Sequence, residues 1–478
     1  MTAKYDIAII GAGVVGAAIA RELSRYNLNI VIIERENDVC MGTSKANSAV
    51  VHAGYDPKAG TLMAKLNVEG NALFEKLCEE LSVPFERNGS YVLAFNEDEL
   101  GHLNDLLRNG ESNGVPELKI LSREALLEKE PNLSQEVKGA LFAKTGAIVD
   151  PMLLTISLVE NAVKNGADCL LDFDVTDIAK EDDIYIIRSK EQEITAKYVI
   201  NAAGVFADKI HNMVAPPTFK ISPRRGQYFL LDKSQEGVVT STIFPCPGKG
   251  GKGILVVPSV HGNVLVGPAS DDIENKEDVG TTDDILYQAR VGARHLLPNI
   301  SLWSCIRTFA GLRAMADRDD FIIEEVKEAP GFFDVAGIKS PGLTAAPAIA
   351  LYVVSLLKEK GVALEERADF DPNIPRKLVI EMTNEERDAK ILTDPRYGRV
   401  VCRCENITEG DIVDAIHRKP GATTLDGVKR RCRAGMGRCQ GGFCGPKVQQ
   451  IIARELEKPL EEIVLEKDGS YILTGRTK

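Results

Sequence analysis

The feature that most constrains the fold is a glycine motif close to the start of the 478-residue chain. Residues 5–10 (YDIAII) form a continuous apolar run, as expected of a buried parallel strand. Gly11, Gly13 and Gly16 follow in Gly-x-Gly-x-x-Gly spacing, before a helical stretch (AAIARELSRYN) and a second strand-like run (NIVIIE) that ends at Glu34. This order predicts a strand–helix–strand unit that binds a dinucleotide.

Each part of the motif has a physical role beside a dinucleotide. Gly11 permits a tight turn, Gly13 lets a pyrophosphate approach the backbone, and Gly16 lets the helix pack closely on the strand. The first helical turn presents free N–H groups and the positive end of the helix dipole to the phosphates. Glu34 is placed to accept hydrogen bonds from a ribose, and the adjacent Arg35 completes the predicted set.

Composition is that of a globular protein and argues against some classes of function. Hydrophobic residues make up 44% of the chain, and the formal net charge is −12. Nucleic-acid binding needs an electropositive surface, so the acidic balance disfavours it. The start lacks the pattern of a secretory signal, and the longest apolar run, 345–357, is shorter than the roughly 20 residues that span a bilayer. We therefore expect a cytoplasmic protein with at most peripheral membrane association.

The ten cysteines are unevenly distributed. In a chain expected in the reducing cytosol they are not predicted to form disulfides. Five are scattered singly and are interpreted as small buried hydrophobic residues, whereas the other five crowd together and indicate a metal site. Cys402-x-Cys404 and Cys439-x4-Cys444 supply four thiolates, enough for a 2Fe-2S cluster or a structural zinc ion. Cys432 is the fifth of the group.

The cysteine-rich segment is also predicted to be helical and basic. Thr408 with Asp411, and Thr423 with Asp426, have the spacing of helix caps, and Pro446 suits a first helical turn. The cysteines would then lie in loops at helix ends. Between positions 396 and 447 there are eleven Lys and Arg against five Asp and Glu, which would offset the charge of a thiolate-bound cluster or form a docking face.

A second glycine-rich segment, PGKGGKG at 247–253, carries Lys249 and Lys252. It lacks the Gly-Lys-Ser/Thr ending of a P-loop, so nucleoside triphosphate binding is not predicted. We interpret it as a hairpin tip between two strands.

Three later segments, with the glycine motif, resemble the FAD-dependent oxidoreductases typified by D-amino acid oxidase. They are GTSKANS (42–48), KYVINAAG ending in Ala203 and Gly204, and FFDVAGIKSPGLTAAPAIALYVVSLL, which reads as strand, turn and apolar helix. The resemblance covers about residues 1–365 and implies bound FAD, with a helix starting near Thr344 that stabilises reduced flavin. The further FAD contacts that it implies are Thr43, Ser44, Asn47, Val175, Gly337, Gly342, Leu343 and Thr344.

Other segments resemble enzymes that oxidise a secondary alcohol on an anionic substrate. Residues 46–81, SPRRGQYFLLD (222–232) and FAGLRAMADRD (309–319) are similar to L-2-hydroxyglutarate dehydrogenases, and FAD-dependent glycerol-3-phosphate dehydrogenases have related arrangements. Such a reaction needs a base for the hydroxyl proton, and His52 is the candidate. The alternative for His52 is a histidine that only hydrogen-bonds flavin or backbone.

A small anionic hydroxy substrate also needs fixed positive charge, preferably a guanidinium. Arg313 is the first candidate because it lies among apolar neighbours, and Arg225 is the second. Lys339 is placed at the flavin edge. For each arginine the alternative is a solvated surface charge.

The C-terminal segments CRCENIT and RAGMGRCQGGFC resemble the bacterioferritin-associated ferredoxin-like domain. That resemblance implies a 2Fe-2S cluster on Cys402, Cys404, Cys439 and Cys444, with Cys432 as a spare thiol or a replacement ligand. The predicted fold is an α/β FAD-binding, Rossmann-like domain with an α+β substrate domain and a small helical 2Fe-2S-binding domain. The predicted boundaries are 1–365 for the flavoprotein (FAD-binding parts about 1–85, 145–215 and 306–365; substrate domain about 86–144 and 216–305), 366–395 for a linker, 396–457 for the cluster domain and 458–478 for a tail.

The whole chain is similar to the large subunit of bacterial anaerobic glycerol-3-phosphate dehydrogenases. The resemblance implies oxidation of sn-glycerol 3-phosphate to dihydroxyacetone phosphate. Flavin and cluster in one chain imply electron transfer to a second redox protein in a hetero-oligomer. Two alternatives stay open: an L-2-hydroxyglutarate dehydrogenase, favoured by the region around His52, and an electron-transfer subunit of a heteromeric amine- or proline-type dehydrogenase.

Overall fold

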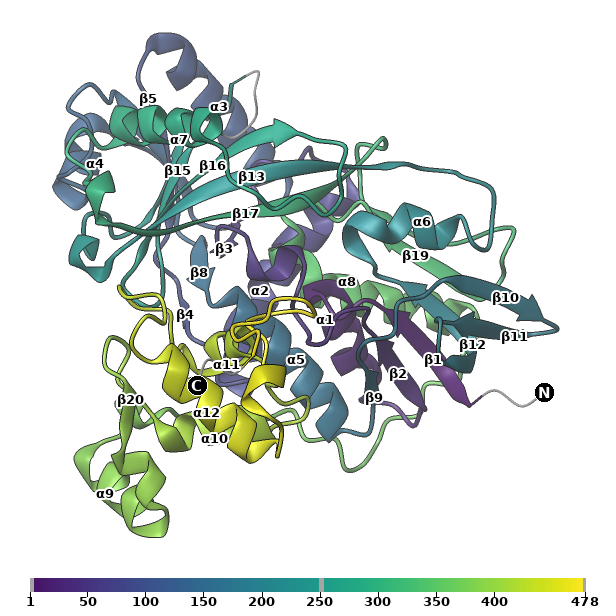
Figure 1. Ribbon diagram of the computed structural model, residues 1–478. Coiled ribbons are helices and arrows are strands. Elements are labelled where there is room, and N and C mark those ends of the chain that lie inside the picture. Colours follow the sequence, from purple (N-terminus) through teal and green to yellow (C-terminus); the bar gives the residue numbers. More distant parts are fainter. Residues whose placement is uncertain (1–3, 249–252, 476–478) are drawn as a thin grey trace.

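The computed structural model describes residues 4–248 and 253–475 of the chain. Two large mixed sheets, a small connecting sheet and a C-terminal helical unit make up the molecule (Figure 1). The predicted hairpin tip at 247–253 falls between strands β14 and β15, but its residues 249–252, including Lys249 and Lys252, lie outside the described residues.

The first sheet is the dinucleotide-binding unit that the glycine motif predicts. β1 pairs in parallel with β2 on one side and β12 on the other. Successive side chains of a strand point to opposite faces, so Ile7 and Ile9 join the core beneath α1, α5 and α8, while Ala8 and Ile10 join the opposite core. The strands, in spatial order, are β10 (Asp177–Glu181), β11 (Ile184–Arg188), β12 (Glu193–Asn201), β1 (Tyr5–Ile10), β2 (Ile30–Ile33) and β9 (Asp168–Leu170), with β19 (Phe332–Ala336) beside β12 and β18 (Ile322–Glu325) beside β19.

Four helices pack together against this sheet. α8 contacts both α1 and α2, and α1 also contacts α5. A Cβ on Gly70 of α2 would lie 2.1 Å from the Thr344 carbonyl oxygen, so the closest approach of α2 to α8 requires glycine. The helices are α1 (Val14–Leu23), α2 (Leu62–Glu80), α5 (Pro151–Lys164) and α8 (Gly342–Glu359).

The second sheet lies above the first in Figure 1 and carries α7 on its outer side. Its long strands β13 and β17 run antiparallel from Ile221 to Leu231 and from Cys305 to Ala316. All of β17 except Cys305 lies in the range predicted for the FAD-binding part, yet it belongs to this sheet because it pairs along the length of β13. The elements are β17, β13, β16 (Val264–Asp272), β15 (Leu255–Pro258), β14 (Thr242–Pro245), β5 (Ser90–Ala94), β7 (Gly139–Ala143) and β6 (Leu118–Ser122), with α3 (Glu97–Ser112), α4 (Arg123–Lys129) and α7 (Asp283–Leu296).

Short elements join the two large sheets. Strand β8 pairs with β3 and β4 in a three-stranded sheet, and α6 follows the end of β12. The bounds are β3 (Val50–Val51), β4 (Phe85–Glu86), β8 (Ala147–Val149) and α6 (Ala207–His211).

The C-terminal unit is a small helical domain with its own apolar core. Thr408 and Asp411 form the predicted reciprocal cap, and Pro446 lies in the first turn of its helix. The predicted cap at Thr423 is wrong: Thr424 is the N-cap, and its hydroxyl oxygen accepts the Gly427 N–H, three residues on. The elements are α9 (Asn384–Thr393), β20 (Val400–Cys402), β21 (Ile407–Thr408), α10 (Glu409–His417), α11 (Leu425–Cys432) and α12 (Gly445–Glu455).

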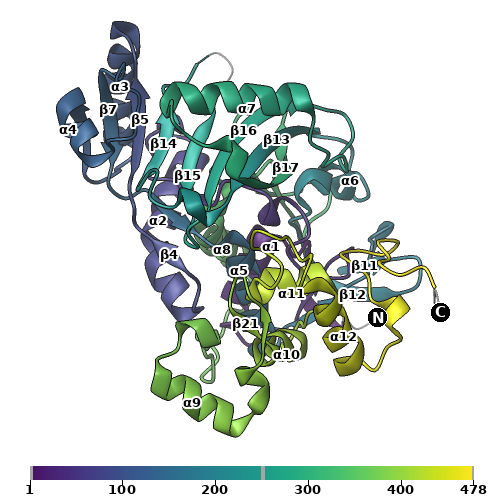
Figure 2. The ribbon, with the colours of Figure 1, turned by 60° about the vertical axis from the view of Figure 1, so that its left-hand side comes forward.

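The C-terminal unit lies beside α5 of the flavoprotein part (Figure 2), and buried ion pairs attach it there. Asp38 lies in the loop after β2, and its carboxylate accepts hydrogen bonds from Arg430 and Arg431 of α11 at 2.7–2.8 Å. All three side chains are at least 97% buried. Arg376, in the predicted linker, pairs with Glu160 of α5 at 2.7 Å. The cluster domain is therefore packed on the flavoprotein part rather than suspended from a linker.

One helix among the described residues, α8, is long and apolar enough to cross a bilayer. More than half of it is buried, and it packs against α1 and α2. Its apolar character is that of a central core helix.

Candidate active site and cysteine cluster

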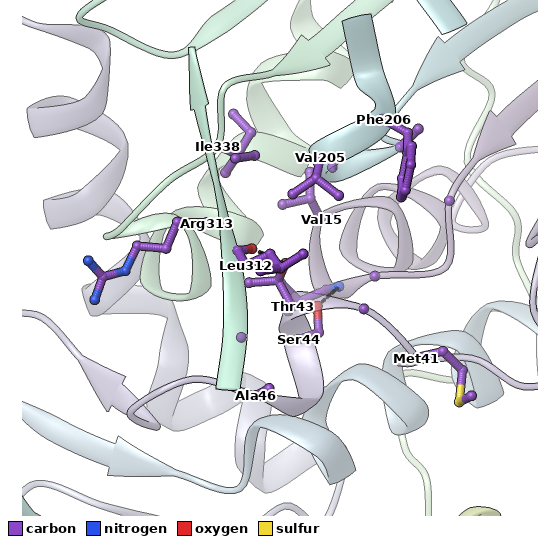
Figure 3. A pocket seen from close by; sticks show the side chains of 18 of the residues that line it. Val15, Met41, Thr43, Ser44, Ala46, Val205, Phe206, Leu312, Arg313 and Ile338 are labelled. Carbon is purple, nitrogen blue, oxygen red and sulfur yellow. Dashed lines mark hydrogen bonds between the residues drawn. The ribbon is translucent and has the colours of Figure 1, made fainter. Parts of the chain in front are cut away.

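A cavity of about 940 Å³ lies between the first sheet and strands β13 and β17. It opens at the carboxyl ends of β1, β2 and β12, where dinucleotides bind in folds of this kind. Its volume is at the upper end of the roughly 300–1,000 Å³ typical of ligand sites, as an extended dinucleotide requires. Figure 3 shows part of the lining, with Arg313 and Phe206 toward opposite ends of the residues drawn.

The three motif glycines have separate structural reasons to be glycine. Gly11 has a φ of +109°, and a Cβ there would lie 2.5 Å from the Ala202 carbonyl oxygen. A Cβ on Gly16 would lie 2.0 Å from the Gly11 carbonyl oxygen, which is the close packing of helix on strand. Gly13 lines the cavity, where a side chain would fill space beside the helix N-terminus. The motif therefore fits a bound pyrophosphate.

Glu34 and Arg35 line the cavity where β2 ends. The Glu34 carboxylate accepts the Ala12 and Glu36 N–H groups at 2.9 and 3.1 Å, and its burial raises its pKa. Arg35 lies over the Phe206 ring, 4.2 Å from its centroid. Val175, Ala203 and Gly204 line the same cavity, as the sequence predicts for the cofactor-binding set.

The loop from Thr43 to Asn47 is held over the glycine motif. Ser44 Oγ accepts the Val14 N–H at 2.9 Å, and Thr43 Oγ1 donates to the Leu312 carbonyl of β17 at 2.5 Å (Figure 3). The Asn47 amide donates to the carbonyls of Thr43 and Ser44, so its side chain orders the loop that lines the cavity.

His52 lies in the cavity wall, and its backbone is fixed from both sides. Its N–H donates to Thr344 Oγ1 at 2.9 Å, and its carbonyl accepts the Asn67 and Asn71 amides. The ring Nε2 lies 3.2 Å from Ser340 Oγ. The imidazole is therefore placed by the fold on the side of the cavity that also contains Lys339 and the start of α8.

The predicted residues around the late turn divide into lining and supporting positions. Gly342 and Leu343 line the cavity at the start of α8. Thr344 is fully buried behind them and holds His52, while Gly337, with a φ of +64°, forms the turn itself. Neither Gly337 nor Thr344 is among the cavity-lining residues.

Arg313 and Lys339 both line the cavity, from β17 and from the turn before α8. Arg313 interacts with the buried Tyr228 hydroxyl, which also contacts Ser48. The Tyr228 ring stacks on Phe309 with a centroid distance of 4.8 Å. Ser48, Tyr228 and Ser340 are not among the residues predicted from the sequence. The period-two pattern of 222–232 could have placed Tyr228 on the same face of the strand as Arg224. It could not have placed Tyr228 beside Arg313, which lies on a different strand.

The prediction that Arg225 binds the substrate is not supported by its position. Arg225 does not line the cavity, and its guanidinium pairs with Asp271 at 2.7 Å and Asp278 at 2.8 Å. Successive strand residues face opposite sides of a sheet, so Gly226, beside Arg313, faces the cavity side and Arg225 does not. The two carboxylates already neutralise its charge.

The four predicted cysteine ligands are arranged as two pairs. Cys404 and Cys439 have their sulfur atoms 3.8 Å apart, and Cys402 and Cys444 are hydrogen-bonded. Two thiolates on one tetrahedral metal, with bonds of about 2.3 Å, lie about 3.8 Å apart. Each iron of a 2Fe-2S cluster can take one such pair, so the four sulfur atoms fit the cluster.

The environment of Cys432 differs from that of the four predicted ligands. The hydrogen bond between Cys402 and Cys444 lowers the pKa of Cys402 and raises that of Cys444, so the pair holds one thiolate and one proton without a metal. Cys432 is buried in α11, its S–H contacts the Val428 carbonyl at 3.4 Å, and burial raises its pKa to about 12. Of the two interpretations of Cys432, the spare buried thiol fits this environment.

Family comparisons agree with the two sites. A model described as FAD dependent oxidoreductase matches residues 6–356, and a model described as BFD-like [2Fe-2S] binding domain matches residues 400–454. The chain belongs to the FAD-dependent oxidoreductase family typified by D-amino acid oxidase. Its cofactors are FAD and a 2Fe-2S cluster, as the sequence predicts.

Individual relatives cover either the whole chain or its flavoprotein part. A glycerol 3-phosphate dehydrogenase of Caloramator mitchellensis is 54% identical over 99% of both chains. The human mitochondrial L-2-hydroxyglutarate dehydrogenase is 28% identical over 75% of this chain and 90% of its own length. The structure of dithionite-reduced L-alpha-glycerophosphate oxidase from Mycoplasma pneumoniae, with FAD bound, matches with a TM-score of 0.75 and 32% identity, covering 79% of this chain and all of the oxidase.

Proposed function

We propose that this chain oxidises sn-glycerol 3-phosphate to dihydroxyacetone phosphate and passes the electrons through its cluster to a second redox protein. The observation that carries the proposal is the 54% identity with a glycerol 3-phosphate dehydrogenase over the flavoprotein part and the cluster domain together. The cavity supports it, because a histidine and two cationic side chains line the end where the turn before α8 lies.

Oxidation of the secondary alcohol removes two electrons and two protons from the substrate. When bound, FAD supplies the acceptor for the hydride equivalent from the alcohol carbon, and the cluster supplies a one-electron route onward. His52 Nε2 is placed to take the hydroxyl proton, and Ser340 Oγ, 3.2 Å away, orients the ring. The fixed backbone of His52 keeps the imidazole in place during the transfer.

The substrate phosphate is held by positive charge at the same end of the cavity. Arg313 presents a guanidinium suited to bidentate contact with phosphate oxygens, and the Tyr228 hydroxyl restricts its position. Lys339 adds a second cation. Arg313 lies on β17 and Lys339 lies in the turn before α8. A phosphate bound by both cations would therefore hold the substrate between these two elements.

An Arg313→Ala variant is expected to keep its flavin and to weaken glycerol 3-phosphate binding by about 10²-fold, since a desolvated charge pair loses one partner. The measurement is steady-state oxidation with an artificial dye acceptor, together with the flavin content. Arg224→Ala is the matched control. Arg224 lies directly opposite Arg313 in the antiparallel pairing of β13 and β17, but its guanidinium forms a surface ion pair with Asp272. An unchanged KM in Arg313→Ala would remove Arg313 from the substrate site.

The cysteine assignment predicts opposite results for two cysteines of the cluster domain. Cys404→Ser is expected to lose the cluster and turnover with the protein acceptor, while the flavin is still reduced by substrate. Cys432→Ala is expected to keep the cluster, because its sulfur contacts a helix carbonyl. Iron content and electron paramagnetic resonance of the reduced proteins measure both. Cluster loss in Cys432→Ala with retention in Cys404→Ser would reverse the ligand assignment.

The cysteine site reaches the protein surface, where a second redox protein could approach the cluster. Cys404 is exposed, and Arg403, Arg438 and Phe443 around it are exposed as well, with Phe443 86% accessible. Arg438 pairs with Asp232, so Arg403 and the apolar Phe443 are the exposed groups that suit a partner with an acidic surface around its own redox group. We also propose a cytoplasmic location, with at most peripheral membrane association.

A second candidate substrate is L-2-hydroxyglutarate, favoured by the 28% identity with the human dehydrogenase. The same histidine and cations would then serve a 2-hydroxy acid with two carboxylates. The dye assay with both substrates tests the proposal: a kcat/KM for glycerol 3-phosphate well above that for L-2-hydroxyglutarate supports it, and the reverse order would replace it.

A further inference from the structure

The C-terminal tail reaches the cofactor cavity. After α12 the chain forms a tight loop, here called the tail loop (464–471), closed by a bridge between Val464 and Tyr471 and by the Leu465 N–H bond to the Ser470 carbonyl. Glu466 and Lys467 of this loop line the same cavity as the glycine motif. Sequence analysis assigned these residues only to a tail.

The tail loop is fixed to both parts of the molecule. The Asp426 N–H at the start of α11 donates to the Leu465 carbonyl at 2.9 Å. From the flavoprotein side, the Asn37 amide donates to the Glu466 carbonyl at 3.1 Å. The position of the loop in the cavity wall therefore depends on how the cluster domain packs against the flavoprotein part.

Charge pairing separates the two cavity-lining residues of the tail loop. The Glu466 carboxylate contacts Lys45 and, at 3.5 Å, Arg430. Burial would raise the pKa of Glu466, but the two cations lower it. Glu466 is therefore ionised, and its carboxylate is already paired with Lys45 and Arg430. Lys467 has no ion pair among residues 4–248 and 253–475.

The tail loop is attached to the segment that covers the glycine motif. Lys45 follows Ser44, whose Oγ accepts the first N–H of α1, at Val14. A Cβ on Gly13 would lie 3.3 Å from that same Oγ. The ion pair between Glu466 and Lys45 therefore holds the tail loop to the segment that covers the helix N-terminus, where the glycine motif meets the cavity.

We propose that Lys467 is an FAD-binding residue whose ammonium group contacts the bound cofactor from the cavity wall, so that the tail loop joins FAD binding to docking of the cluster domain. Glu466 holds the loop in place through Lys45 and Arg430. Because coupling between two equilibria is reciprocal, bound FAD also stabilises the docked cluster domain. Flavin and cluster are then retained together, as electron transfer between them requires.

The test is the FAD dissociation constant of flavin-depleted, cluster-containing protein, measured by fluorescence titration without substrate. Lys467→Ala is expected to weaken FAD binding about tenfold, the effect of losing one charge-assisted contact. Lys467→Arg should stay within about twofold of the unmodified protein, since it keeps the charge. Lys458→Ala is the matched control, because Lys458 is exposed in the same tail and does not line the cavity.

Cluster absorbance is recorded in every variant and should not change. An FAD affinity in Lys467→Ala equal to that of the unmodified protein would overturn the proposal. Equal losses in the arginine variant, or loss of the cluster in Lys467→Ala, would also overturn it, because Lys467 would then act through packing rather than charge. No substrate is present, so failure here is distinct from failure of the proposed substrate assignment.

Discussion

A His52→Asn variant is expected to reduce its flavin about 10²–10⁴-fold more slowly with glycerol 3-phosphate, the usual contribution of a general base. The imidazole is the titratable group placed to receive the hydroxyl proton, and asparagine cannot accept it. The fold should survive, because the contacts that fix this segment involve the His52 backbone N–H and carbonyl. Anaerobic stopped-flow absorbance at saturating substrate measures the rate.

Two variants serve as controls for this prediction. Ser340→Ala should slow the reaction much less, since Ser340 only orients the ring. His102→Asn should have no effect, because His102 lies on α3 and does not line the cavity. A His52→Asn rate within about threefold of the unmodified protein would contradict the role of base and favour a histidine that only hydrogen-bonds the flavin or backbone.

An Asp38→Asn variant is expected to lose about 3–5 kcal/mol of stability at the interface between the flavoprotein part and the cluster domain. The substitution leaves Arg431 buried without its counter-charge and leaves Arg430 with only the longer contact to Glu466, at 3.5 Å. Calorimetry should show the transition of the cluster domain at a temperature at least about 10 °C lower. Asp272→Asn is the matched control: it breaks an exposed pair with Arg224 and should cost at most about 1 kcal/mol.

The Asp38 interaction also predicts how stability depends on pH. Burial would raise the pKa of Asp38, but Arg431 and Arg430 outweigh it and lower that pKa to about 2. A carboxyl with a lowered pKa stabilises the folded state above its unfolded pKa, near 3.9, and loses that contribution as the pH falls toward 2. Equal acid sensitivity of Asp38→Asn and the unmodified protein between pH 4 and 2 would contradict this account.

Local patterns predicted the elements that carry the cofactors. The glycine spacing has its cause within a few residues, because Gly16 packs against Gly11. The cap at Thr408 and Asp411 is likewise a local interaction. The thiolate pairs could be expected because the four cysteines flank short elements of one small domain.

Interactions between distant segments could not be predicted in the same way. The sequence predicts a substrate role for both Arg225 and Arg313, but the pleat of β13 and the carboxylates of Asp271 and Asp278 keep Arg225 out of the cavity. The side chains that position His52 and Arg313 come from other segments, as with Ser340 and Tyr228. Lys467 reaches the cavity only because the cluster domain docks on the loop after β2.

The central claim is tested most directly by anaerobic reduction of the cofactor-replete protein, with flavin and cluster absorbance followed as glycerol 3-phosphate or L-2-hydroxyglutarate is added. We expect glycerol 3-phosphate to bleach the flavin first and the cluster afterwards, and L-2-hydroxyglutarate to leave both oxidised. Bleaching by L-2-hydroxyglutarate alone, or by neither compound, would contradict the proposed function.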